Sequence, residues 1–286
     1  MALLPLVSSG VHGAKSLTHT YSSLYSVLWM RSAGQAALEC LAQGLTTLPL
    51  HSLRLEPLAS DGEVTKAFAG ALAAAGFECH PYPRFQNWFH RLDGDDFRAY
   101  WSKRPSRLRN TVERKQRKLM RECGYRVHVY TQESASHALS QYHDVHRASW
   151  KPSEVFPSMV DGMVTRFAEA GWLRLGVLTV SYRPVAAQIW FVVHRKASIF
   201  KLVYDTASKA SSPGSILTRH LMEHVIDIDH VDEIDFLYGS DAYKSDWVSQ
   251  KRDRVGLAVG RPPRHAGKPG WAWRINRMWR SAGTPQ

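Results

Sequence analysis

The segment from Gly171 to Trp247 constrains the fold of this chain more than any other. Three apolar runs with the composition of strands come first, and a Ser/Pro/Gly-rich loop, an amphipathic helix and a last strand follow. The strands are expected over residues 172–180, 185–194, 198–204 and 233–237, and the helix over residues 215–228. Strands that alternate with a helix in this order predict an α/β (α+β) fold, in which helices flank a mixed sheet.

The loop before that helix has the chemistry of an anion-binding loop. Ser212 precedes Pro213 at the expected first helical turn, where serine is a favoured cap and proline a favoured first residue. The first amide groups of a helix lack intrahelical partners and lie at the positive end of its dipole, so they suit a phosphate. Lys209 adds a cation. We therefore expect a phosphate-bearing donor to bind Lys209, Ser211, Ser212, Gly214 and Ser215.

Three ordered motifs in this part of the chain are similar to those of a known family. They read Lys201-Leu-Val-Tyr204-Asp205, Ser211-Ser-Pro-Gly214-Ser-Ile-Leu217 and Ile234-Asp235-Phe-Leu-Tyr-Gly239-Ser-Asp241-Ala-Tyr243-Lys244-Ser-Asp-Trp247. They resemble the acyltransferase lobe of the CelD-type proteins, a GNAT-superfamily branch linked to exopolysaccharide production and related to the Fem-type peptidoglycan aminoacyltransferases. The resemblance covers residues 145–256 and implies a GNAT-like acyltransferase fold.

The N-terminal part is expected to form a reduced second lobe of the same kind. Helices are expected over residues 22–42 and 63–75, and strands over residues 51–58, 77–83 and 86–92. The strand–helix–strand order matches a reduced first lobe of the Fem-like double architecture. The predicted division is an N-terminal GNAT-like lobe at 1–124, an acyltransferase lobe at 125–260 and a basic Trp/Arg-rich tail at 261–286.

The net charge of +12 is concentrated in two segments of the chain. Residues 103–121 and 251–280 each hold nine Lys or Arg residues and one acidic residue, which leaves the rest of the chain with a net charge of −4. The first segment is expected to be a long helix over 103–124, whose cations form either a solvated face or an anion-binding face. Suitable partners include CoA phosphates, RNA, polysaccharide anions and anionic lipid.

Other features of the composition argue against several classes of protein. No apolar run approaches the roughly 18 residues of a membrane span, and no basic start precedes the short apolar N-terminus, so we expect no membrane span and a cytoplasmic location. Three scattered cysteines fit neither a disulfide framework nor a zinc site. His143 and His146 are expected to be a surface or core pair. We therefore expect no metal.

The resemblance implies that the donor carbonyl lies between two splayed central strands, which end near Asp205 and Leu237. Asp205 is the first candidate for a polar catalytic role, and a turn-forming aspartate that caps the loop is the alternative. Tyr243 could act as a general acid toward the thiolate leaving group. Gln188 and Lys201 are further candidates, because they are polar residues in apolar strands.

Each remaining candidate also has a structural alternative. Unpaired burial of a polar group costs about 1–3 kcal/mol, so Gln188 is expected to face a cleft or a specific partner, unless it points outward. Trp150 and Lys151 match a Ser-Trp-Lys element of the family and could line the acceptor side, although Trp150 could instead be a core anchor. The expected substrate-binding set is Trp150, Lys151, Tyr204, Asp241 and Lys244, with a purely structural Asp241–Lys244 turn as the alternative.

These features favour an N-acyltransferase whose co-substrate is acetyl-CoA or a longer acyl-CoA, or an acyl-carrier-protein thioester. The acceptor would be an amine on a sugar, a peptide or a small molecule. A Fem-type transferase that uses aminoacyl-tRNA is an alternative, with the basic helix and tail on the tRNA phosphates. No aromatic RNP motif supports RNA binding, however. A non-catalytic binding module on the same fold is a third hypothesis, because the fold alone does not imply chemistry.

Overall fold

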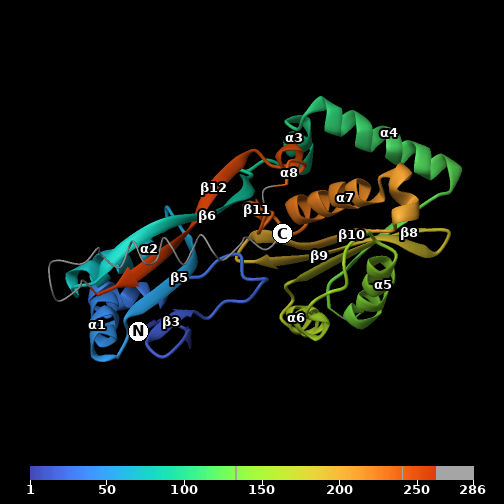
Figure 1. Ribbon diagram of the computed structural model, residues 1–286. Coiled ribbons are helices and arrows are strands. Elements are labelled where there is room, and N and C mark those ends of the chain that lie inside the picture. The colour runs from blue at the N-terminus through green and yellow to red at the C-terminus, as the bar shows by residue number, and fades with distance from the viewer. Residues whose placement is uncertain (133, 240, 262–286) are drawn as a thin grey trace. The chain divides into compact units, whose positions relative to one another are not determined.

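The computed structural model describes residues 1–132, 134–239 and 241–261 of the 286-residue chain (Figure 1). The described residues form two compact units, residues 1–87 with 252–261 and residues 88–251. The chain passes from one unit to the other along strands β6 (Glu78–Arg91) and β12 (Gln250–Gly260). Apart from Arg261, the predicted basic tail lies outside the described residues.

The first unit is a sheet with two helices. Its elements are β1 (Ala2–Leu3), β2 (Leu6–Ser8), β3 (Gly13–Ser16), β4 (Leu28–Trp29), the 3-10 helix η1 (Arg31–Ala33), α1 (Gly34–Thr47), β5 (Ser52–Ala59) and α2 (Glu63–Ala74). The strand order is β2-β3-β5-β12-β6. Side chains of β5 alternate between buried and partly exposed, as its sequence pattern predicts. Leu38, Leu55 and Leu72 are fully buried in its core.

Two predictions for this unit are wrong at the level of single elements. The helix expected from residue 22 begins at Gly34, whose φ of 63° follows a 3-10 turn that separates β4 from α1. The two strands expected over 77–83 and 86–92 form the single strand β6. Strand β6 continues without a break through Pro81 and Pro83.

The second unit is a mixed sheet flanked by helices, as predicted. Its elements are α3 (Phe97–Ser102), α4 (Ser106–Glu122), β7 (Arg126–Tyr130), α5 (Ala135–Arg147), α6 (Pro157–Glu169), β8 (Leu173–Val180), β9 (Arg183–Val193), β10 (Lys196–Tyr204), the 3-10 helix η2 (Thr206–Ser211), α7 (Pro213–Asp227), β11 (Glu233–Asp235) and α8 (Lys244–Trp247). The strand order is β6-β11-β10-β9-β8-β7, in which only β10 and β11 are parallel.

The helices of this unit cover both faces of its sheet (Figure 1). Helices α3, α4 and α7 lie on one face, and α5 and α6 lie on the other. Helix α7 approaches closely at Gly176 of β8, where a Cβ would lie 2.8 Å from Leu221 Cδ1. A glycine in β8 thus provides the space that Leu221 of α7 occupies.

The basic helix belongs to this second unit. Pro105 precedes α4 and Gly124, with φ 65°, follows it, as the sequence predicts. Val112 and Leu119 of α4 are buried in the same core as Leu217 and Leu221 of α7. The division between units at residue 87 thus differs from the boundary expected at 124, because α3 and α4 pack on α7.

Among the described residues, none of the helices combines the length and apolarity required to cross a bilayer. The same residues contain no group of three or more side chains arranged to hold a metal ion.

Candidate functional site

The site begins where two strands separate. Strands β10 and β11 pair only between Lys196–Ser198 and Glu233–Asp235, whereas β10 continues to Tyr204. After β11 the chain turns, since Leu237 has a φ of 53° and its amide donates to the Asp235 carboxylate at 2.7 Å. Crevices at the carboxyl ends of parallel strands are common ligand sites. The sheet therefore provides an opening beside the second half of β10.

The predicted anion loop is a 3-10 helix followed directly by α7. Asp205 caps η2 by accepting a hydrogen bond from the Ala207 amide at 2.9 Å. Ser212 holds the N-cap position of α7 in a left-handed conformation, with φ 55° and ψ 47°, and its side chain makes no cap hydrogen bond. At the start of α7, the Ile216 amide donates to the Ser212 carbonyl at 3.2 Å. The earlier amides of α7 therefore remain available to an anion.

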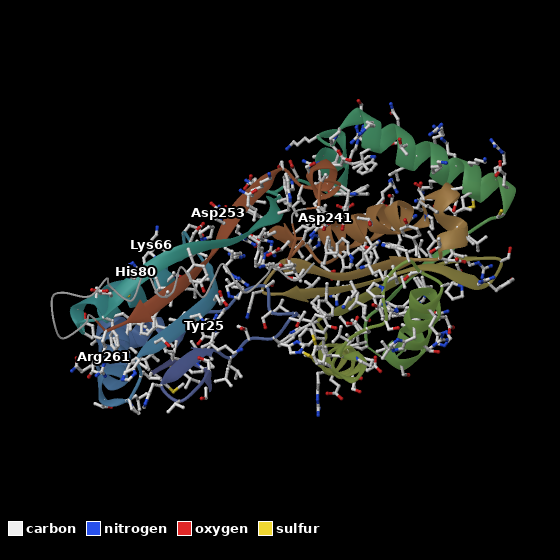
Figure 2. The ribbon with its side chains drawn as sticks, viewed as in Figure 1. Tyr25, Lys66, His80, Asp241, Asp253 and Arg261 are labelled. Carbon is white, nitrogen blue, oxygen red and sulfur yellow. The ribbon has the colours of Figure 1, made fainter. Side chains whose placement is uncertain are left out.

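A pocket of about 630 Å³ lies at this loop, and we call it the β10 pocket. It is lined by Leu108, Trp150, Lys151, Leu202, Tyr204, Lys209, Ser212, Gly214, Ser215, Thr218, Asp241, Tyr243, Asp246 and Trp247. Nine of the fourteen predicted site residues are in this set, among them Asp241, which is labelled in Figure 2. A Cβ at Gly214 would lie 3.1 Å from the Tyr204 ring, so a larger residue there would have to displace this ring slightly.

Aromatic side chains form one wall of the β10 pocket. The Trp150 and Tyr204 ring centroids lie 4.3 Å apart, and the Lys151 ammonium lies 5.8 Å from the Trp150 ring centroid. Trp150 is 52% exposed and Tyr243 is 46% exposed. Trp150 is therefore not a core anchor. The Trp150 and Tyr243 rings are both accessible to a bound molecule.

Two ionisable groups of the β10 pocket have shifted pKa values. Burial and, to a smaller extent, the charge of Asp241 raise the pKa of Tyr243 to about 12. Burial lowers the pKa of Lys151, and the nearby cation of Lys201 lowers it further, while Asp241 opposes the shift. Tyr243 is thus a protonated phenol at neutral pH and can donate a hydrogen bond or a proton.

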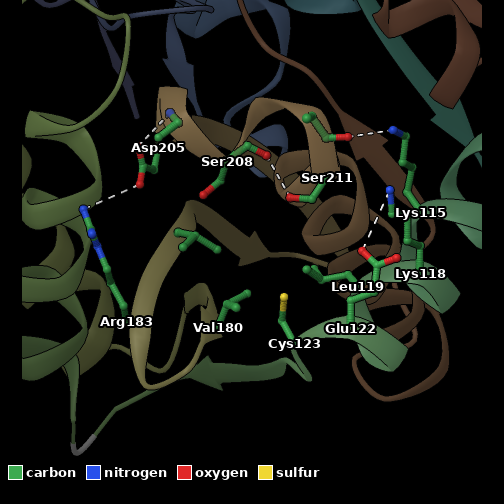
Figure 3. A pocket seen from close by; sticks show the side chains of 13 residues that line it. Lys115, Lys118, Leu119, Glu122, Cys123, Val180, Arg183, Asp205, Ser208 and Ser211 are labelled. Atoms are coloured by element: carbon green, nitrogen blue, oxygen red, sulfur yellow. Dashed lines mark hydrogen bonds and ion pairs between the residues drawn. The ribbon is translucent and has the colours of Figure 1, made fainter.

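Asp205 does not line the β10 pocket. Its carboxylate caps η2 and lies 3.7 Å from the Arg183 guanidinium. It faces a different cavity, formed with α4 and the β8–β9 hairpin (Figure 3). The structure therefore places Asp205 in the alternative role, as a capping aspartate. Ser211 also lines that second cavity, and its hydroxyl donates to the Ser208 carbonyl at 2.8 Å.

Gln188 is fully buried and has specific partners instead of facing a cleft. Its amide nitrogen donates to the Gly214 carbonyl at 2.9 Å and to the Thr218 hydroxyl at 2.8 Å. Its amide oxygen accepts a hydrogen bond from the Trp190 indole at 2.8 Å. Gln188 thus fixes the first turn of α7 on β9, which makes it a positioning residue for the anion loop.

The other two predicted lysines are bound within the protein. The Lys201 ammonium forms an ion pair with Glu154 at 2.6 Å. Lys244 is 4% exposed, and its ammonium donates to the carbonyls of Tyr238 at 2.6 Å and Gly239 at 3.1 Å. Neither residue lines the β10 pocket. Lys244 therefore fits the structural alternative, because it holds the turn that presents Asp241 and Tyr243.

Five lining residues were not predicted from the sequence. Leu202 lies two residues before Tyr204 on the same strand, so the period of two could have identified it. Thr218 lies one helical turn after Gly214. Leu108, on α4, reaches the pocket only through tertiary packing. Asp246 and Trp247 follow the Tyr243-Lys244 motif and form part of the short helix α8.

Comparison with known proteins shows what the segment around this site is similar to. Residues 106–245 match the acetyltransferase (GNAT) domain family. The match contains all of the predicted catalytic and binding residues, and it begins at α4, in agreement with the place of α4 in the second unit. No curated protein sequence matches the chain.

Several solved structures share the fold at low sequence identity. The C-terminal domain (DUF2156) of a protein assigned as a lysylphosphatidylglycerol synthetase, from Agrobacterium fabrum, has a TM-score of 0.61 at 12% identity, over 97% of this chain and 83% of that chain. L-PGS from Bacillus licheniformis has a TM-score of 0.56 at 11% identity, over 90% and 80% of the two chains. FemX has a TM-score of 0.56 at 9% identity, over 79% and 77%. At these identities the similarity shows the fold alone.

Proposed function

We propose that the β10 pocket transfers an acyl group from an acyl-CoA or acyl-carrier-protein thioester to an amine. One observation carries the proposal: nine residues chosen for donor binding, substrate binding and catalysis line a single pocket at the separation of β10 and β11. Twelve of the fourteen lining residues lie within the segment that matches the GNAT domain, and that domain supports acyl transfer in general.

The donor's phosphates would bind at the start of α7. The first α7 amides, the Ser212 hydroxyl and the Lys209 ammonium provide hydrogen bonds and positive charge at one end of the β10 pocket. The acyl chain and its thioester would then extend along Leu202 and Tyr204 of β10. A GNAT fold generally uses acyl-CoA, so CoA is the co-substrate to test first.

The residues of the β10 pocket fit the needs of thioester aminolysis. The free amine of the acceptor attacks the thioester carbonyl, a C–N bond forms, the C–S bond breaks and the amine proton passes to water. Tyr243 gives its phenolic proton to the departing thiolate and regains one from solvent. A β10 amide beyond the three-residue pairing would stabilise the oxyanion. Asp241 would orient the amine, and Gln188 and Lys244 would act by positioning.

The acceptor would bind against the aromatic wall of the pocket. Trp150 and Tyr204 offer ring faces, and Lys151 offers a cation beside them. These groups suit an amine carried by a sugar, a peptide or a small polar molecule. The resemblance to the CelD-type proteins favours an amino sugar of an exopolysaccharide. A cytoplasmic location would give the enzyme access to acyl-CoA.

Transfer from aminoacyl-tRNA is the second candidate, and the cationic surface of α4 favours it. Exposed lysine and arginine side chains lie along α4. One of them, Arg114, has no ion-pair partner among the described residues. One structural relative is named for a lysyl product, which places aminoacyl groups among the donors to test. Binding through phosphates would weaken steeply with salt.

Isothermal titration of acetyl-CoA and a long-chain acyl-CoA, at low and moderate salt, tests the proposed donor. We expect saturable binding that Gly214→Asp weakens at least about tenfold, because the new carboxylate would repel phosphate at the α7 start. Gly70→Asp is the matched control, since it adds the same charge to α2, where a new Cβ meets nothing within 4 Å. Equal binding by the two variants would contradict the donor site. If neither thioester binds, charged tRNA or a non-catalytic module becomes the better hypothesis.

A further inference from the structure

A second cavity shares helix η2 with the β10 pocket, and we call it the α4 pocket (Figure 3). Its volume is about 450 Å³, within the roughly 300–1,000 Å³ typical of small-molecule sites. It is lined by Lys115, Lys118, Leu119, Glu122, Cys123, Val180, Arg183, Val185, Asp205, Ala207, Ser208, Ala210 and Ser211. The two pockets have no lining residue in common: η2 contributes Lys209 to the β10 pocket, and Ala207, Ser208, Ala210 and Ser211 to the α4 pocket.

One part of the α4 pocket is apolar. Leu119 of α4 and Val185 of β9 are buried, and Val180 of β8 lies beside them at the hairpin. Ala207 and Ala210 add short apolar side chains from η2. An aliphatic chain would cover this surface and remove it from water, at a gain of about 25 cal/mol per Å² of apolar area.

The polar part of the α4 pocket leaves one positive charge without a carboxylate partner. Glu122 lies 3.8 Å from the Lys118 ammonium, and the Asp205 carboxylate lies 3.7 Å from Arg183. Lys115 instead donates to the neutral Ala210 carbonyl at 2.6 Å and forms no ion pair in the part of the chain that the structure describes. Three cations therefore face two carboxylates in the α4 pocket, and Lys115 carries the excess charge.

Two hydroxyl groups of η2 also line the α4 pocket. Ser211 donates to the Ser208 carbonyl, while the Ser208 hydroxyl makes no hydrogen bond to another described residue. Figure 3 shows Ser211 between Ser208 and Lys115, with the Ser208 hydroxyl pointing away from the lysine. A bound anion can therefore accept a charge-assisted hydrogen bond from Lys115, and Ser208 lies apart from it.

We propose that the α4 pocket binds an aliphatic carboxylate of medium chain length. Its carboxylate binds Lys115, and its chain covers Leu119, Val180 and Val185. A monoanion fits better than a phosphate dianion, because the two carboxylates of the pocket would repel the second negative charge. This inference does not depend on the proposed acyl transfer, since binding is measured directly.

Titration with octanoate tests the proposal, and acetate and octan-1-ol serve as probes that lack the chain or the charge. We expect saturable octanoate binding. Acetate, which lacks the chain, and octan-1-ol, which lacks the charge, should each bind at least about tenfold more weakly. Octanoate should also slow the alkylation of Cys123 by iodoacetamide, measured by peptide mass spectrometry. Cys40 is the internal reference, because it is exposed and lies in the other unit.

Two substitutions should remove this binding by different means. Lys115→Met removes the unpaired charge, and Val180→Trp fills the apolar part, so each should weaken octanoate about tenfold or more. Arg114→Met is the matched control, because it removes one charge from the neighbouring position outside the α4 pocket. Circular dichroism shows whether each variant folds. If only one of Lys115→Met and Val180→Trp folds, that variant alone is sufficient for the test. Unchanged affinity in the folded variants, equal loss in Arg114→Met, or displacement of octanoate by CoA would overturn the proposal.

Discussion

Gln188 shows how a single buried amide can organise a site that it does not enter. Among the four predicted catalytic residues, Gln188 contacts the start of α7 directly, through the Gly214 carbonyl and the Thr218 hydroxyl. Its oxygen also satisfies the Trp190 indole. Because all three groups are buried, the loss of Gln188 leaves each of them without this partner.

We therefore expect Gln188→Leu to destabilise the protein by about 1–3 kcal/mol, the usual cost of leaving buried polar groups unpaired. Urea denaturation followed by circular dichroism measures this change. Thr218→Val is the graded comparison, since it removes the two hydrogen bonds of the Thr218 hydroxyl, with Gln188 and with the Gly214 carbonyl, and leaves the Trp190 contact intact. An unchanged urea midpoint in Gln188→Leu would show that water or a shifted side chain replaces these bonds.

Tyr243 and Asp205 can be separated by kinetics, because only Tyr243 lines the β10 pocket. If Tyr243 is the general acid, Tyr243→Phe should lower kcat by about 10²–10⁴-fold with little change in KM. Asp205→Asn should retain turnover, since asparagine can still accept the Ala207 amide and cap η2. A steady-state assay of each variant with acyl-CoA and an amine acceptor that the wild type acylates decides between them. Loss of kcat in Asp205→Asn alone would reverse these roles.

At the scale of elements, the contact between α7 and β8 fixes how close the start of α7 lies to the sheet. Gly176 of β8 provides the space for this contact, as a Cβ there would lie 2.8 Å and 3.0 Å from the two methyl carbons of Leu221. Gln188 then fixes the first turn of α7 laterally. Two side-chain contacts thus determine where the free amides of α7 lie.

The Gly176→Ala substitution should consequently destabilise the protein by about 1–3 kcal/mol, through overpacking against Leu221. Gly162→Ala is the opposite case. Gly162 lies in α6 with nothing within 4 Å of a new Cβ, so alanine should stabilise the helix by about 0.5–1 kcal/mol. Thermal melts of both variants give the comparison. A stabilising Gly176→Ala would mean that Leu221 moves aside without cost.

At the scale of the whole molecule, each unit has its own hydrophobic core and its own helices. The second unit also buries ionisable groups that couple its stability to pH. Burial and the charge of Arg219 lower the pKa of His220 to about 4, and its ring shares a hydrogen bond with the Tyr125 hydroxyl at 3.1 Å. Burial and Arg104 lower the pKa of His90 to about 4 as well.

These lowered pKa values predict that acid destabilises the protein. Below about pH 6.5 an unfolded histidine takes up a proton that the buried histidine does not, so the free energy of unfolding should fall as the pH falls from about 6.5 to about 4. His220→Gln should flatten this dependence in urea titrations at several pH values. His137→Gln, at an exposed position on α5, should leave the pH dependence of the free energy of unfolding unchanged. An equal slope for the wild type and His220→Gln would contradict the assignment to His220.

Much of the fold was predictable because it rests on local patterns. The strands from 172 to 204, the helix after Pro213 and the helix before Gly124 all lie where periodicity and capping residues indicate. Helix α1 was misplaced at its start, because the apolar spacing of residues 22–33 resembles a helix but forms an extended segment and a 3-10 turn. The spacing of apolar residues alone could not distinguish a helix from an extended segment here, since tertiary packing decides between the two.

The site was predictable only in part, and the residues show why. Local sequence was enough to predict the loop before α7, the aromatic residues of the β10 pocket and the Asp241–Tyr243 turn, because each depends on neighbours a few positions away. Tertiary structure decided that Asp205 and Ser211 face another cavity, that Gln188 and Lys244 hold backbone carbonyls, and that Leu108 reaches the pocket. Strand register and helix packing set the direction of each side chain, and those depend on contacts between residues far apart in the chain.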